Sequence, residues 1–387
     1  MNKDKLLVSN QVTNMQFVMV CAGVVIGMVG QTVSLPLFIS SFGGTTGPYF
    51  IVLWCSFLFN CFFWPIVFYR IRKGIITPEM RTYKKHYKLV LIGVFDALNG
   101  ILVVFASPLS RTPGALQAIL VQTTIPFTIV ISKFMIRKTY SFDQIIGGVM
   151  TVLGCLVSLI PKFDNPDIGS FEFYWPLIYL IGIIPSVLMN IMEESIFNDI
   201  HDFDGYYMLA WESLYQVTTV GILFWTDILP GFGTSDSIAN WGSRIGNGLT
   251  CFWNPLGSTS DNCSFCFLLG AIFTVAYCFS YVFGAQMMKI ASANSTAVVQ
   301  SLAPTISIFF WLIFTGLNRW AGGDSYTKLD IICYSISVVI IGIGVIMYRR
   351  AEKTKLKQDY AKLSDEENSA QEGMINNKDS IDRTDRT

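Results

Sequence analysis

The chain has 387 residues, of which 52% are hydrophobic and only 14% are charged, and its formal net charge is zero. Roughly a quarter of the residues of an ordinary soluble domain are charged, so this composition excludes a soluble protein with a fully hydrated surface. The zero net charge by itself indicates no partner, and we expect no nucleic-acid partner.

Uncharged runs long enough to cross a bilayer recur along the whole chain. About 20 apolar residues in a helix cross roughly 30 Å of hydrocarbon, and these runs lack the alternation of a barrel strand. The expected fold class is therefore an all-α polytopic membrane protein with about ten transmembrane helices. We expect these spans near residues 16–38, 47–69, 89–107, 114–132, 142–161, 175–192, 206–229, 266–288, 294–314 and 328–348.

Two of the spans resemble each other in their polar positions as well as in their apolar ones. Residues 118–131 read AILVQTTIPFTIVI and residues 297–309 read AVVQSLAPTISIF, so that in both a Gln is followed four residues later by a Pro. Spans five and ten also each begin beside an aspartate, Asp143 and Asp330. Chance similarity between apolar helices is the alternative explanation, but it does not account for matched polar and Pro positions.

We therefore expect two halves of five helices each, and because five is odd the second half is inverted in the membrane, as in many secondary transporters. Residues 16–161 form the first half and residues 175–348 the second, with a linker at 162–174. Residues 1–15 form an N-terminal tail, and residues 349–387 form a C-terminal tail whose polar composition predicts disorder.

The Lys and Arg residues are distributed unevenly between the two sides of the membrane. All but five of the 27 lie in the tails and in the loops at 70–88, 133–141 and 289–293. The positive-inside rule therefore predicts that both termini are cytosolic and that the long loop at 230–265 is lumenal.

Two features of the 230–265 loop agree with a lumenal position. An Asn-Cys-Ser glycosylation sequon begins at Asn262. Cys251, Cys263 and Cys266 lie in or beside the loop, where an oxidising lumen permits a disulfide bond.

The Gln–Pro pairs have two possible roles. Pro126 and Pro304 donate no backbone hydrogen bond, so each frees a carbonyl near Gln122 or Gln300 and offers polar groups to a cavity at the middle of the membrane. Alternatively, each Gln holds neighbouring helices together with a hydrogen bond. The occurrence of the pair in both halves favours the cavity.

Two acids lie deep within predicted spans, each with an amide on the same helix face. Asp96 has Asn99 one turn away, and Glu212 has Gln216 four residues later. A charge at this depth costs on the order of 3 kcal/mol, so both acids are candidates for proton coupling, with a buried structural hydrogen bond as the alternative. Glu194 at the end of span six is a third candidate, for which a solvated helix end is the alternative. Mid-span Lys or Arg is absent, which favours a cation or a proton as cargo.

Several stretches resemble the chloroquine-resistance-transporter-like family of the drug/metabolite transporter superfamily. They are FDALNGILVVFASPLSRTPGALQAILVQTTIP at 95–126, IPSVLMNIMEESIFND at 184–199 and RIGNGLTCFW at 244–253. The resemblance implies ten helices in two inverted halves, in the membrane of an acidic digestive vacuole or lysosome. It also implies proton-driven export of small, often cationic solutes, amino acids and peptides to the cytosol, while similar plant proteins act on glutathione-like thiols in plastids. The residues that match family positions are Asp96, Arg111, Gln117, Gln122, Glu194 and Gln216.

The chain departs from the family pattern in three places. Its lumenal loop has three cysteines where the family usually has four, and by comparison with the family we expect a Cys251–Cys266 bond, with Cys251–Cys263 as the alternative. Leu302 and Ala303 stand before the Pro of span nine where the family has Gln-Gly, and an acid that some members carry in span eight is missing. These departures leave the substrate range open.

The function expected from these observations is secondary transport of small solutes. It covers basic or cationic amino acids, peptides, thiols or drug-like cations, moved from a vacuole or lysosome to the cytosol with protons. A Tyr-x-x-Leu sorting pattern at Tyr360 and Leu363 agrees with that location. We expect a monomer in the lipid bilayer that binds a small-molecule substrate and protons, without cofactor or metal. The expected residues of the substrate cavity are Gln31, Asn99, Gln117, Gln122, Pro126, Gln216, Gln300 and Pro304.

Two other functions are less consistent with the sequence. A nucleotide-sugar or other metabolite transporter of the Golgi or a plastid, with the same fold, would need basic residues in its cavity to bind phosphate. An intramembrane enzyme would need a catalytic motif, but the chain has no H-E-x-x-H sequence, and its two His residues, His86 and His201, lie in predicted loops.

The predicted topology is directly testable by cysteine-accessibility or protease-protection mapping in sealed vesicles. Both termini and the 70–88 loop are expected on the cytosolic side, and the 230–265 loop on the other side, because of the Lys and Arg distribution. Termini on opposite sides would exclude an even number of spans and with it the inverted repeat.

Overall fold

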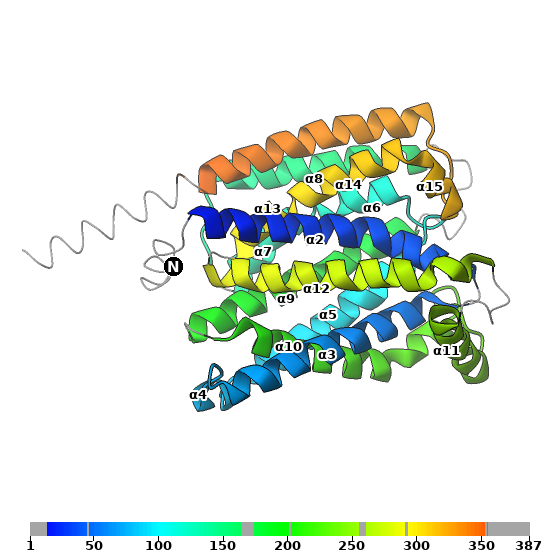
Figure 1. Ribbon diagram of the computed structural model, residues 1–387. Coiled ribbons are helices and arrows are strands. Elements are labelled where there is room, and N and C mark those ends of the chain that lie inside the picture. The colour runs from blue at the N-terminus through cyan, green and yellow to red at the C-terminus, as the bar shows by residue number, and fades with distance from the viewer. Residues whose placement is uncertain are drawn as a thin grey trace, which may run out of the picture.

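The computed structural model describes residues 14–44, 46–135, 137–163, 174–200, 203–254, 261–290, 293–352 and 354. Long helices lie side by side in one bundle, and no strand occurs in the described residues (Figure 1). The helices are α2 (Asn14–Ser40), α3 (Pro48–Arg72), α4 (Pro78–Arg81), α5 (Tyr87–Ala106), α6 (Gly114–Val121), α7 (Thr124–Met135), α8 (Phe142–Phe163), α9 (Tyr174–Asp199), α10 (Gly205–Ile222), η2 (Leu223–Ile228), α11 (Ile238–Trp253), η4 (Asp261–Phe265), α12 (Cys266–Ile290), α13 (Ala293–Gln300), α14 (Leu302–Ile313), α15 (Thr315–Trp320) and a last helix at Lys328–Glu352.

Within the described residues, nine helical segments are long and apolar enough to cross a membrane. The predicted fold class, an all-α polytopic membrane protein, is therefore confirmed. The described chain begins and ends at the same end of the bundle, on the left of Figure 1, which we call the terminal end. The opposite end, where α11 lies, is the loop end. An even number of crossings is needed for this arrangement, and α10, which is less apolar and packs against α3 and α5, supplies the tenth.

Both Gln–Pro segments interrupt their helices, as the sequence predicts. One span is divided into α6 and α7 at Gln122, and another into α13 and α14 at Ser301. At the first break the backbone N–H groups of Gln122 and Thr123 bond carbonyls three residues earlier, both at 3.0 Å. Pro126 has no N–H for the Gln122 carbonyl, which instead accepts from Ile125 at 3.3 Å.

The first helix of each half packs along the third helix of the other half. These pairs are α2 with α12 and α9 with α5. A glycine permits the close approach in both: a Cβ at Gly27 would lie 2.6 Å from the backbone nitrogen of Ser280, and a Cβ at Gly182 would lie 2.9 Å from the Cβ of Leu102. This reciprocal packing is the arrangement expected of an inverted repeat.

The expected disulfide pairing of Cys251 with Cys266 is wrong. Cys251, in α11, is bonded to Cys263, in η4. The sulfur of Cys266 is a free thiol 3.2 Å from that of Cys251 and 3.1 Å from the hydroxyl of Ser41. Cys266 is the first residue of α12 and is held against the end of α2, so Cys263 in the preceding turn forms the bond.

Several other expectations concern positions outside the described residues. They are most of the 1–15 tail, most of the 162–174 linker, most of the 349–387 tail and the sorting pattern at Tyr360 and Leu363. The expected glycosylation concerns Asn262, whose side chain is not described.

The disulfide pairing predicts a difference between two serine variants. Cys263→Ser should lower the free energy of unfolding by about 3 kcal/mol, because a cross-link over a loop of this length stabilises by that amount. Cys266→Ser should keep the bond and most of the stability. Peptide mapping without reductant, combined with thermal unfolding in detergent, measures both effects. A Cys251–Cys266 peptide from the parent protein would contradict the pairing.

Candidate functional site

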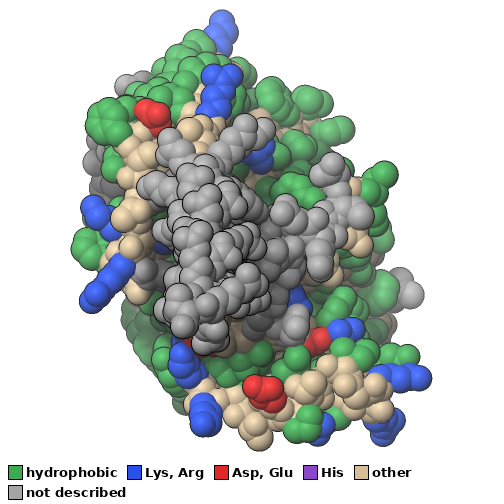
Figure 2. Space-filling view, turned by 90° about the vertical axis from the view of Figure 1, so that its left-hand side faces the viewer, with side chains coloured by type: hydrophobic (Ala, Val, Ile, Leu, Met, Phe, Trp, Pro, Cys, Tyr) green, Lys and Arg blue, Asp and Glu red, His purple; other side chains and the backbone are tan. Residues whose placement is uncertain are grey.

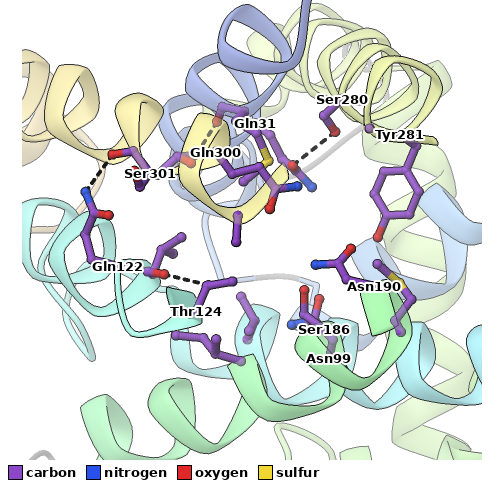
Figure 3. Close-up of a pocket in the computed structure, with 18 of the residues that line it drawn as sticks. Gln31, Asn99, Gln122, Thr124, Ser186, Asn190, Ser280, Tyr281, Gln300 and Ser301 are labelled. Atoms are coloured by element: carbon purple, nitrogen blue, oxygen red, sulfur yellow. Dashed lines mark hydrogen bonds between the residues drawn. The ribbon is translucent and has the colours of Figure 1, made fainter. Parts of the chain in front are cut away.

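A cavity of about 150 Å³, here called the central cavity, lies inside the bundle between helices of both halves. Its walls come from α2, α5, α6, α7, α9, α12 and α13, and its side chains converge from opposite sides (Figure 3). Among the described residues of the wall, Glu193 is the one carboxylate, and Lys and Arg are absent. The amides of the wall belong to Gln31, Asn99, Gln117, Gln122, Asn190 and Gln300.

Gln122 connects the two helix breaks. Its side-chain nitrogen donates a hydrogen bond of 2.8 Å to the backbone carbonyl of Ser301 (Figure 3). Its side-chain oxygen is buried and has no hydrogen-bond partner in the described part of the chain. Both roles considered for this residue therefore hold, because Gln122 joins two helices and also lines the cavity. Gln300 lines the same cavity, but among the described residues it forms no comparable bond across the breaks.

Three other predicted amides line the cavity and also form hydrogen bonds that hold the surrounding helices in place. Gln31 accepts a hydrogen bond of 3.4 Å from Ser280, and Asn99 donates one of 2.8 Å to the carbonyl of Gly182. The side-chain nitrogen of Gln117 donates two bonds of 2.7 Å to backbone carbonyls of the preceding loop. These three amides reach the cavity wall while fixing the helices around it. The predicted residues that lie outside the wall are Pro126, Gln216 and Pro304.

Asp96 lies one side chain behind the cavity wall. It is 1% exposed and accepts hydrogen bonds from the hydroxyls of Tyr281, at 2.7 Å, and Tyr277, at 3.1 Å. Tyr281 itself lines the cavity. Gln216 donates to the hydroxyl of Tyr277 at 3.1 Å, which places this predicted residue in the network around Asp96. Two phenol donors stabilise a carboxylate that would otherwise be unpaired in the interior.

Glu212 is buried more completely and has a different environment. It is fully buried, and neither carboxylate oxygen has a hydrogen-bond partner among the described residues. Its charge would interact with those of Asp96 and Glu193. Three interacting carboxylates that were all ionised in an apolar interior would repel one another, so binding of a proton or a cation would stabilise the cluster.

The two neighbouring glutamates of α9 lie in different environments. Glu194 forms an ion pair with Lys138, with both carboxylate oxygens within 2.8 Å of the ammonium group, and does not reach the central cavity. Glu193 does line the cavity. The sequence analysis named Glu194 as a candidate for proton coupling, with a solvated helix end as the alternative, and did not name Glu193. It also missed Tyr277 and Tyr281, although their spacing of four residues in an apolar span places both hydroxyls on one helix face.

Arg111, which matches a family position, has a structural role at the loop end. Its guanidinium lies 3.7 Å from the ring centroid of Trp175, and it donates to the backbone carbonyl of Phe105. These contacts tie the loop after α5 to the start of α9, away from the cavity.

The unequal bonding of the two glutamines gives a prediction about stability. Gln122→Leu should lower the free energy of unfolding by about 1–3 kcal/mol, because it leaves the Ser301 carbonyl unsatisfied in the interior. Gln300→Leu removes an amide from the same cavity without breaking a bond across the breaks, and is the matched control. Thermal unfolding in detergent compares them, and equal losses would contradict the proposed importance of the Gln122 bond.

Comparisons with known proteins agree with this architecture. A family profile described as "CRT-like, chloroquine-resistance transporter-like" matches residues 17–348. Crt homolog 3 of Dictyostelium discoideum is 26% identical over 301 residues, which cover 70% of this chain and 59% of that protein. Crt homolog 2 of the same organism is 25% identical over 338 residues, covering 81% of this chain and 68% of that protein. The chloroquine resistance transporter of Toxoplasma gondii is 22% identical over 307 residues, covering 75% of this chain and 34% of that protein. The chain therefore spans about three fifths of the first relative and a third of the last. It belongs to the chloroquine-resistance-transporter-like family.

Proposed function

We propose that the protein is a proton-coupled secondary transporter that carries small cationic solutes, such as basic amino acids, peptides or drug-like cations, out of an acidic compartment. The observation that carries the proposal is the central cavity, whose wall contains amides, hydroxyls and one carboxylate but no described Lys or Arg. Such a wall suits a solute with an amine and does not suit a phosphate. That difference also disfavours a nucleotide sugar as cargo.

The three buried acids supply a basis for coupling. Glu193 lies in the wall, where it can pair with a cationic solute, and Asp96 lies behind Tyr281, where it can hold a proton. A cluster of three carboxylates can bind a proton on one acid and a cation on another at the same time. Binding both before the protein changes conformation is the requirement for symport.

The broken helices supply a basis for the conformational change. Carrier proteins with inverted repeats move one set of helices against the other around a site at the middle of the membrane. The central cavity lies beside the breaks at Gln122 and Ser301 and between the two halves, where such a site is expected. Small rotations about these breaks would open the cavity alternately toward each side.

The proposed orientation places the terminal end in the cytosol. Lys and Arg side chains project around the part of this end that is described (Figure 2). Lys85 and Lys88 pair with Asp199 at 2.7 Å, and the side chain of Lys85 is about half exposed while that of Lys88 is buried. The hydrogen bond and charge of Asp199 raise the pKa of Lys85 above its ordinary value, so it stays charged at cytosolic pH. The positive-inside rule then favours the cytosol for this end.

Neutral variants of the two deeply buried acids test the coupling. Asp96→Asn and Glu212→Gln keep shape but cannot ionise, so both should fold and reach the membrane. At least one should lose pH-gradient-driven uptake into proteoliposomes while still exchanging solute across the membrane without a gradient. Asp96 is the stronger candidate because Tyr281 connects it to the cavity.

Asp143→Asn, at the mouth of α8, is the matched control and should transport like the parent. If both acid variants also accumulate solute like the parent, proton coupling through Asp96 and Glu212 is wrong. Glu193 would then be the next residue to test, and a gradient-independent facilitator would be the alternative.

A further inference from the structure

A second cavity, of about 180 Å³, lies at the terminal end of the bundle. Its walls come from the last turns of α3, α9 and α12 and from the first turn of α10. Four of its side chains are charged or carry an amide: Arg70, Asp204, Gln286 and Lys289. This second cavity is distinct from the central cavity but touches it, because Ala285 lines both.

The two cavities meet at Ala285, a small side chain of α12. Ala285 is buried, and a Cβ at Gly205 would lie 3.7 Å from its Cβ and 4.0 Å from the ring tip of Phe197. The first turn of α10 therefore rests directly on α12 and α9. A modest outward movement of α10 would therefore uncover Ala285, the residue that the two cavities share.

One ion pair holds the start of α10 in this position. The guanidinium of Arg70, at the end of α3, donates to the same carboxylate oxygen of Asp204 at 2.6 and 3.0 Å. It also lies 5.0 Å from the ring centroid of Tyr206. The other oxygen of Asp204 accepts from the backbone N–H of Tyr207 at 3.0 Å and so caps α10. The pair thus connects the end of α3 to the first turn of α10 at the mouth of the second cavity.

We propose that the second cavity is the vestibule through which solute leaves the central cavity at the terminal end, and that the Arg70–Asp204 pair is the latch that keeps it closed. The proposal rests on the proposed transport function and adds an exit route and a gating residue pair to it. An anionic lipid head group is a different ligand that could occupy a cavity with two basic residues, but the carboxylate of Asp204 at its mouth disfavours an anion.

A cysteine at this shared position reports on opening without any solute. The Ala285→Cys variant, in sealed vesicles, is treated with a charged, membrane-impermeant methanethiosulfonate added on the side of the membrane that carries the termini. The parent chain gives the background from its own free cysteines. We expect slow labelling in the latched protein and labelling about threefold to fivefold faster when Asp204→Asn is added, the size of effect expected for a partly exposed ion pair. Asparagine keeps the helix cap, so a faster rate reports the lost ion pair and not an unwound α10.

Lys85→Gln is the matched control, because it breaks an exposed ion pair with Asp199 at the same end and should leave the rate unchanged. Leu209→Cys, also in the wall of the second cavity, is the second reporter if Ala285→Cys does not fold. Labelling that is absent in both reporters, or unaffected by Asp204→Asn, would overturn the vestibule. Labelling suppressed by anionic lipid in otherwise neutral vesicles would assign the cavity to a head group and overturn it as well. Because no solute or pH gradient is involved, this result is independent of whether proton-coupled uptake is observed.

Discussion

The hydrogen bond from Gln122 to the Ser301 carbonyl is the contact on which the central part of the structure depends. A helix that breaks inside hydrocarbon leaves backbone groups without partners, and each costs several kcal/mol unless another group satisfies it. Two helices break here, one in each half, and a side chain at the first break satisfies a carbonyl at the second. The breaks therefore stabilise each other, and the polar groups that remain face a cavity rather than lipid.

The acid cluster depends in turn on this cavity. Carboxylates are tolerated at such depth when they face protein or a polar pocket and have partners. Asp96 has two tyrosine hydroxyls, Glu193 has the cavity itself, and Glu212 has no hydrogen bond among the described residues. The three carboxylates thus differ in how well each is paired, and this difference is the basis of the proposed coupling.

Periodicity and composition were sufficient to predict the spans, the helix breaks and four of the amides that line the cavity, and the family resemblance added Gln117. Long apolar runs and a Pro within them determine local structure, so these features can be inferred from short stretches of sequence. The choice between Glu193 and Glu194 could not be inferred, because neighbouring helix residues point about 100° apart and only packing fixes the rotation of α9. Tyr277 and Tyr281 were missed for a similar reason. Their hydrogen bonds to Asp96 join two helices that are far apart in the sequence, and only packing brings these helices together. The pairing of Cys251 with Cys263 depended on where α12 begins, which the sequence leaves uncertain by a few residues.

Uptake of a solute panel by the unmodified protein in proteoliposomes, with and without an imposed pH gradient, tests the central claim most directly. The claim is that a cavity with amides, hydroxyls and one carboxylate, backed by buried acids, carries cations together with protons. The account predicts that basic amino acids or other small cations accumulate when the gradient is imposed, and that phosphate esters and nucleotide sugars do not. Accumulation of the anionic solutes, or cation uptake that is the same with and without the gradient, would contradict it.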